Sequence, residues 1–275
     1  MKAITKLSAL AFAALLMTAL VGAGCKDAVN DPPREFETNY YPIDEGARYV
    51  YRVDSLDDAG TPTYAGETIS TYAFYRIFDG APYLARVDSF GGEIDTGYFR
   101  DTERGAYVYA DTSGLTALVP DSLLAFFGDD SLDAIDVDVE FVALSYPLDA
   151  GRSWSAFRIT ALIFSLVGLD ASVAPREELT LALDDGERTF ETVPVHYALT
   201  IAAPDTTTGF AREETFEARA WYAEGVGVVK IEGDAVVLYA LDGRFAAADF
   251  NPFEEEPTLP EGKFRRTLTS YERAE

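Results

Sequence analysis

The stretch TYAFYRIFDGAPYLARVDSF, residues 71–90, places two runs of aromatic and branched side chains on either side of the dipeptide Asp79-Gly80. Asp-Gly is a preferred two-residue turn, because both central positions of a type I′ turn need a positive φ angle. The flanking runs hold the residue types that β-strands favour. This stretch therefore predicts an antiparallel β-hairpin.

The same pattern extends along most of the chain. In ARYVYRVDS, residues 47–55, the side chains of Tyr49, Tyr51 and Val53 alternate with Val50, Arg52 and Asp54, which is the period of a β-strand. Roughly ten to thirteen such strands are expected, and their spacing favours an all-β, mainly antiparallel fold. Further turns are expected at Glu103–Gly105, Asp184–Gly186, Glu224–Gly225 and Gly233–Asp234.

Helical patterns are sparse. PDSLLAFFG, residues 120–128, predicts one or two helical turns, with Asp121 or Ser122 as N-cap and Gly128 at the end. The apolar run AVVLYAL, residues 235–241, follows the expected turn at Gly233–Asp234 and is predicted as a further strand. The fold is thus expected to contain one or two short helices.

The segment ITALIFSLVGL, residues 159–169, is apolar on both faces and too short to cross a bilayer. We predict a strand that is buried on both sides. The alternative is a groove for a lipophilic ligand, lined by Ile159, Leu162, Phe164 and Leu166.

Two phrases resemble each other at a distance of about a hundred residues: YYPIDEGARYVY within 40–51 and SYPLDAGRSWSAF at 145–157. Gly46 and Gly151 suit a turn or bulge with a positive φ angle. Residues 128–145, before the second phrase, contain no Pro-, Gly- or Ser-rich linker. We therefore predict a single β domain over residues 40–275 in which the two phrases open two strands.

These phrases, followed by ERTFETVPVHY and WYAEGVGVVK, resemble a family of secreted bacterial lipoproteins of uncharacterised role. The resemblance covers about residues 40 to 240, and WYAEGVGVVK is its most specific part. It implies one large curved sheet that forms an open half-barrel or clam, similar to periplasmic lipoprotein carriers.

The N-terminus combines Lys2 and Lys6 with an apolar run and then GAGC, which ends at Cys25. This pattern predicts a signal peptide over residues 1–24. Cys25 is the only cysteine, and its position resembles the acylation site of bacterial lipoproteins, although Gly22 stands where Leu is usual. We predict a lipid on Cys25 and a tether over residues 25–39; the alternative is an unmodified cysteine in a secreted protein.

The chain is strongly acidic, with 47 Asp and Glu against 22 Lys and Arg. Loss of Lys2 and Lys6 with the signal peptide takes the net charge from −25 to −27. Such a charge opposes binding to nucleic-acid phosphates. A nucleic-acid partner is therefore not expected.

The sequence offers few groups for catalysis or metal binding. His196 is the only histidine and lies on the polar face of a predicted strand, so a zinc site or a Ser-His-Asp triad is not expected. The acidic stretches 54–60 and 129–140 do not follow the EF-hand pattern and are predicted to face solvent. No cofactor, metal or catalytic residue is predicted.

These observations predict a cell-envelope lipoprotein that is held by Cys25, most simply in the outer membrane, on the periplasmic side or at the cell surface. Its β domain is expected to be a non-enzymatic binding or structural module, with an envelope protein or a lipophilic ligand as partner. The alternative is a carrier or sensor that holds a lipophilic ligand in the half-barrel. A hydrolase that uses carboxylates is less favoured.

Overall fold

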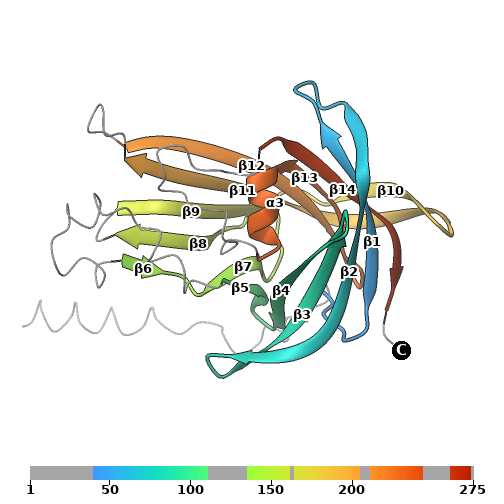
Figure 1. Ribbon diagram of the computed structural model, residues 1–275, viewed down its shortest axis with the longest axis horizontal. Coiled ribbons are helices and arrows are strands. Elements are labelled where there is room, and N and C mark those ends of the chain that lie inside the picture. The colour runs from blue at the N-terminus through green and yellow to red at the C-terminus, as the bar shows by residue number, and fades with distance from the viewer. Residues whose placement is uncertain (1–39, 111–134, 162–163, 205–210, 244–260, 274–275) are drawn as a thin grey trace, which may run out of the picture. The chain divides into compact units, whose positions relative to one another are not determined.

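The computed structural model describes residues 40–110, 135–161, 164–204, 211–243 and 261–273 (Figure 1). These residues form fourteen strands in one antiparallel sheet, together with one short helix. The strands are β1 (Arg48–Leu56), β2 (Pro62–Phe78), β3 (Ala81–Phe90), β4 (Glu93–Thr102), β5 (Gly105–Tyr109), β6 (Ile135–Val137), β7 (Glu140–Ser145), β8 (Ser153–Ala161), β9 (Phe164–Val173), β10 (Glu177–Leu183), β11 (Gly186–Pro204), β12 (Ala211–Ala223), β13 (Gly227–Asp234) and β14 (Lys263–Glu272); the helix is α3 (Ala235–Leu241). The all-β prediction is confirmed.

The sheet curls into a half-barrel whose strand order is β6-β8-β9-β11-β12-β13-β14-β1-β2-β3-β4-β5-β7, with β10 paired to β11. β6 and β7 stand at opposite ends of this order although only Asp138 and Val139 separate them in the chain. The amide of Asp138 donates to the carbonyl of Arg158, and the amide of Ala110 donates to the carbonyl of Val139. One continuous segment therefore leaves one end of the sheet and enters the other.

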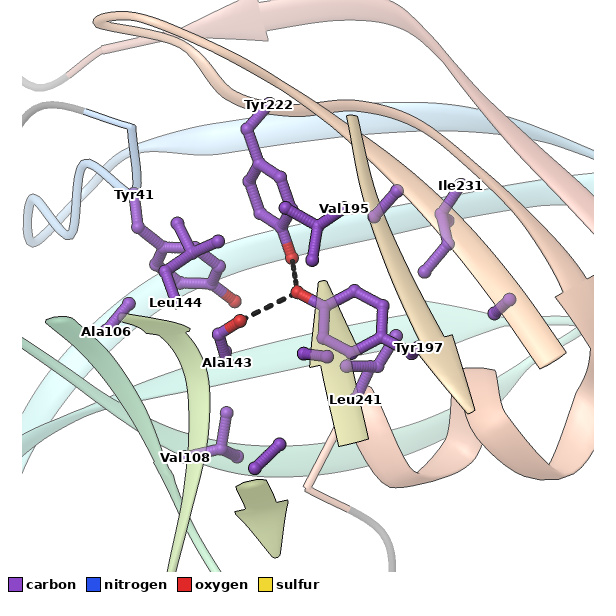
Figure 2. Packing of buried hydrophobic residues seen from close by; sticks show 14 of the residues in the cluster. Tyr41, Ala106, Val108, Ala143, Leu144, Val195, Tyr197, Tyr222, Ile231 and Leu241 are labelled. Carbon is purple, nitrogen blue, oxygen red and sulfur yellow. Dashed lines mark hydrogen bonds between the residues drawn. The ribbon is translucent and has the colours of Figure 1, made fainter. Parts of the chain in front are cut away.

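Side chains join the two ends of the sheet beyond this crossing. The indole Nε1 of Trp154 on β8 donates to the carbonyl of Val142 on β7, at 2.8 Å. The hydroxyl of Tyr197 on β11 donates to the carbonyl of Ala143, at 2.7 Å, and lies 2.8 Å from the hydroxyl of Tyr222 (Figure 2). These bonds satisfy carbonyls of β7 from inside the half-barrel.

Most of the expected hairpin turns are present, but the turn expected at Gly233–Asp234 is wrong: both residues end β13 and pair with β14 through Gly233↔Phe264 and Asp234↔Lys263. Asp79 and Gly80 have φ angles of 50° and 80°, as a turn with two positive φ angles requires, and they join β2 to β3. Gly46 and Gly151 also have positive φ angles, of 93° and 85°. The two similar phrases thus precede β1 and β8, two strands of the same sheet.

Two further local predictions were wrong. Residues 159–169 do not form one strand: 159–161 end β8 and 164–169 begin β9, and the two strands pair through Ile159↔Val167 and Ala161↔Phe164. The sequence hides the break because residues 161–164, ALIF, contain none of the residue types that mark a turn. Residues 235–241 form α3 instead of a strand, since a short run that is apolar all round has no periodicity that separates helix from strand. The predicted helix at 120–128 lies outside the described residues.

The inner face of the half-barrel carries a large apolar core. Alternate residues of β11 are buried throughout, with at most 4% exposure: Val193, Val195, Tyr197, Leu199 and Ile201. Side chains from the other strands and from α3 join them in one cluster. The concave face is therefore filled over most of its length.

Candidate functional site

Helix α3 occupies part of the space inside the half-barrel. It follows β13 directly and packs against β11, β12 and β13. Six of its seven side chains are buried, and Tyr239 is the exception, with 39% exposure. The helix thus acts as an apolar plug, and the residue that follows it, Asp242, is carried into the interior.

Asp242 is buried and meets two arginines there. Arg266 on β14 donates to both carboxylate oxygens, at 3.0 Å to Oδ1 and 2.6 Å to Oδ2. Arg86 on β3 donates to Oδ1 at 2.6 Å and to Asp88 Oδ2 at 2.8 Å. Two buried cations thus face two buried carboxylates, and the cluster of Arg86, Asp88, Asp242 and Arg266, called here the ionic cluster, is neutral as a whole.

The local electrostatics keep both arginines charged. Burial lowers the pKa of the Arg86 guanidinium, but the carboxylates of Asp88 and Asp242 outweigh burial and raise this pKa well above its usual range. Burial also lowers the pKa of the Arg266 guanidinium, but the carboxylate of Asp242 raises it, and the net effect is a raised pKa. Arg86 also lies over the ring of Phe99, 4.3 Å from the centroid, where a cation is favoured.

A glycine on the neighbouring strand makes room for the end of α3. Gly97 on β4 lies opposite Arg86 in the β3–β4 ladder. A Cβ atom at this position would stand 2.5 Å from the carbonyl oxygen of Asp242 and 2.8 Å from the ring of Phe99. The missing side chain therefore allows Asp242 to approach the sheet closely.

Tyrosines lie beside the ionic cluster. A small cavity of about 50 Å³ lies among Tyr41, Tyr49, Tyr51, Tyr72, Tyr222 and the ionic cluster. Burial raises the pKa of each of these phenols, and that of Tyr49 to about 12. These hydroxyls therefore stay protonated at neutral pH and can serve as hydrogen-bond donors.

A second, larger cavity of about 300 Å³ lies beside α3. Its size is at the lower end of the range for small-molecule sites. Most of its lining is apolar, and Arg266 belongs to the walls of both cavities. The residues that line it are Val53, Thr68, Phe90, Ala235, Leu238, Tyr239, Glu261, Phe264 and Arg266.

The chemistry of this arrangement favours binding. The larger cavity offers aromatic and aliphatic surface with few polar groups, which suits an apolar or amphipathic molecule. The positive and negative charges of the ionic cluster balance each other. The end of the larger cavity next to Arg266 therefore favours the uncharged part of a ligand. We call the larger cavity the α3 cavity.

The structure describes only some of the residues singled out from the sequence. Ile159 and Leu166 are in the core cluster, with 2% and 7% exposure, and the backbone of Phe164 opens β9. Leu162 and Cys25 lie outside the described residues, so the lipophilic groove and the lipid on Cys25 both stay predictions. His196 is exposed, and partial burial together with the charge of Arg219 lowers its pKa.

Sequence reasoning missed the ionic cluster. Its four members come from β3, β14 and the end of α3, and no sequence spacing links them. One local pattern pointed to part of it: in LARVD the residues Arg86 and Asp88 fall on the same face as the apolar Leu84. Two charges on an apolar face indicate a buried pair that needs further partners.

The described part of the chain also lacks two other kinds of feature. It contains no helix that is long and apolar enough to cross a membrane. Within the same residues, no group of three or more His, Cys, Asp or Glu side chains is arranged to hold a metal ion.

Comparison with known proteins gives distant structural likenesses. No family model and no curated protein matches the chain. An inferred lipoprotein from Parabacteroides distasonis is 13% identical, with a TM-score of 0.38, over 86% of this chain and 99% of its own. An inferred exported protein with a YmcC-like fold from Bacteroides fragilis is 11% identical, with a TM-score of 0.43, over 86% and 100%. The hypothetical lipoprotein YmcC from Escherichia coli is 9% identical, with a TM-score of 0.30, over 86% and 90%.

Proposed function

We propose that this chain is a lipid-anchored protein of the bacterial cell envelope whose β domain binds a small lipophilic ligand in the α3 cavity. Binding, and not catalysis, is the proposed role. The observation that carries the proposal is the α3 cavity itself, about 300 Å³ of mainly apolar space beside α3.

The anchor is supported by the sequence at the N-terminus. A basic start, a short apolar run and GAGC precede the single cysteine, Cys25. Several acyl chains on one residue give firm attachment, because each buried methylene contributes about 0.8 kcal/mol. The outer membrane is the proposed location.

The nature of the ligand follows from the walls of the cavity. Val53 and Leu238 are buried aliphatic side chains, while Phe90 and Tyr239 are both 39% exposed and line the same space. Exposed aromatic rings beside buried aliphatic groups suit a ligand that enters from solvent and buries an apolar tail. Among the described residues that line the cavity, polar groups come from Thr68, Glu261, Arg266 and the hydroxyl of Tyr239.

A non-enzymatic role is supported by the state of the ionizable groups. The buried arginines are held by Asp88 and Asp242 at 2.6–3.0 Å, so these carboxylates serve as partners for cations. The buried phenols keep their protons because burial raises their pKa values. A general base of suitable pKa beside the α3 cavity would contradict this part of the proposal.

The binding site can be tested by titration of purified protein with a fluorescent fatty acid, using a variant that fills the cavity. Val53→Phe enlarges a buried side chain in the cavity wall and is expected to weaken binding at least tenfold. Val50→Phe is the matched control, because Val50 is a buried residue of the same strand, on the face opposite Val53. Equal binding by both variants would overturn the site.

The anchor is tested separately. Cys25→Ser is expected to make membrane attachment reversible, so that repeated washing removes the variant from envelope membranes that retain the unmodified protein. If the variant is retained like the unmodified protein, the proposed lipidation is wrong. That result would not bear on ligand binding in the α3 cavity.

A further inference from the structure

The hairpin of β2 and β3 extends beyond the strand that flanks it. The β1–β2 ladder ends at Arg48↔Thr71, whereas β2 continues to Phe78 in a ladder with β3 (Figure 1). A bulge between Tyr72 and Tyr75 marks the start of this extension. We call residues 73–82 the hairpin arm.

The hairpin arm exposes large apolar side chains. Phe74, Tyr75 and Ile77 are 49%, 58% and 71% exposed. Strand alternation places Tyr75 and Ile77 on one face and Phe74, Arg76 and Phe78 on the other. Contiguous exposed apolar groups of this kind mark interaction sites with proteins or membranes.

The arm is held in a fixed conformation by its other face. The ring of Phe78 stacks on Tyr109 at 4.0 Å between centroids and meets the edge of Tyr98 at 4.8 Å. The guanidinium of Arg76 lies 5.0 Å from the centroid of Phe78 and donates a hydrogen bond to the hydroxyl of Tyr98. The exposed side chains are therefore presented by an ordered strand, which lowers the entropic cost of binding.

The arm is also poor in acidic residues. From Thr68 to Val87 the chain has one acid, Asp79, although the whole chain has 47 among 275 residues. A chain of net charge −25 is repelled by anionic lipid headgroups, and this repulsion is weakest where acids are few. The arm is thus suited to approach a lipid surface.

The N-terminal segment reaches the fold beside this arm. The amide of Gly46 donates to the carbonyl of Tyr72 at 2.7 Å, and the amide of Tyr72 donates to the carbonyl of Ala47 at 2.9 Å. Pro42 and Ile43 line the same cavity as Tyr75. Residues 25–39 span at most about 50 Å when extended, at ~3.3–3.6 Å per residue. A lipid on Cys25 would therefore keep the arm within reach of the bilayer.

We propose that Tyr75 and Ile77 insert into the interfacial layer of the bilayer that holds the lipid anchor. Tyr is one of the two aromatic residues enriched at the level of lipid headgroups, and Arg, here Arg76, also serves as an interfacial anchor. The bilayer is favoured over a protein partner because the anchor limits how far the arm can move from it. The inference rests on the anchor proposed above, and it gives the protein a second membrane contact that fixes its orientation.

The test uses mature chain, residues 25–275, with Cys25→Ser, so that binding does not depend on the lipid. Flotation with vesicles of phosphatidylethanolamine and phosphatidylglycerol is expected to recover this chain. The pair Tyr75→Ser and Ile77→Ser is expected to lower the partition coefficient about tenfold, because two half-exposed apolar side chains no longer reach the interface. The control pair is Tyr64→Ser and Ile94→Ser, whose targets are equally exposed, at 57% and 70%, outside the arm.

Retained binding by the control pair and loss by the arm pair, with unchanged circular dichroism, would support the inference. Equal partition by both pairs, or no flotation of the parent chain, would overturn it. A second measurement keeps the apolar surface of the arm. The tryptophan introduced by Tyr75→Trp is expected to shift its fluorescence to the blue when vesicles are added. The tryptophan introduced by Tyr64→Trp, outside the arm, is expected to show no shift. Capture of a specific envelope protein by the arm, without vesicle binding, would also overturn it. Because the parent chain lacks the lipid, these outcomes are independent of whether Cys25 is acylated in cells.

Discussion

Arg266 and Asp242 form a two-point ion pair inside the half-barrel, with nitrogen–oxygen distances of 3.0 and 2.6 Å. The pair ties β14 to the end of α3, and Arg86 adds a third bond to the same carboxylate, from β3. The side chains of Arg266 and Asp242 are only 17% and 6% exposed. The position of α3, and with it the shape of the α3 cavity, thus depends on one carboxylate.

Removal of that carboxylate should strongly destabilise the fold. Asp242→Ala leaves Arg266 buried without its carboxylate, and loss of one partner of a buried pair costs about 3–5 kcal/mol. The free energy of unfolding in urea measures this loss. The matched control is Asp44→Ala, whose partner Arg273 is 46% exposed, and about 1 kcal/mol or less is expected there. Similar losses for both variants would show that the ionic cluster does not hold α3.

Gly97 should tolerate no side chain. In Gly97→Ala the new Cβ atom meets the backbone oxygen of Asp242, so the end of α3 must shift, and overpacking of this kind costs about 1–3 kcal/mol. Gly168→Ala is the control, because its nearest neighbour is the side-chain end of Arg158, which can move. Thermal unfolding of both variants checks this order. A larger loss for Gly168→Ala would contradict the close approach of α3 to β4.

The stability of the protein should depend on pH through Asp101. Burial raises the pKa of its carboxyl from 3.8 to about 7, against the hydrogen bond from Tyr146. Between about pH 4 and pH 7 the folded state therefore holds a proton that the unfolded chain releases. This group favours the folded state fully at low pH, and its contribution falls as pH rises through this window.

Asp101→Asn should remove that contribution to the pH dependence. The melting temperature of the unmodified protein should fall relative to that of the variant as the pH is raised from about 4 to about 7. Melting curves of both proteins at a series of pH values measure the difference. A constant difference across the series would show that the carboxyl of Asp101 titrates normally.

Much of the fold was predictable because it is local. Alternation identified the strands, and turn residues such as Asp79-Gly80 identified the hairpins, since both depend on neighbours in sequence. Helix α3 was not predictable in this way, because AVVLYAL is apolar all round and its conformation is set by the space inside the half-barrel. The break between β8 and β9 was hidden for the same reason.

The candidate site depends on contacts between distant segments, so it was the least predictable part. Arg86 and Asp242 are 156 residues apart, and only the folded sheet brings them together. Val53 could be assigned to the inner face by its alternation with Arg52, but its place in a cavity depends on where α3 ends. The hairpin arm was visible as AFYRIF, yet its exposure follows from the point at which β1 stops.

The most direct test of the central claim is mass spectrometry of lipids extracted from the protein after gentle purification from membranes. The α3 cavity predicts one lipophilic species in near-stoichiometric amount in the unmodified protein and in Val50→Phe, and its depletion in Val53→Phe. No lipophilic species above background in the unmodified protein, or the same amount in Val53→Phe, would contradict a ligand in the α3 cavity.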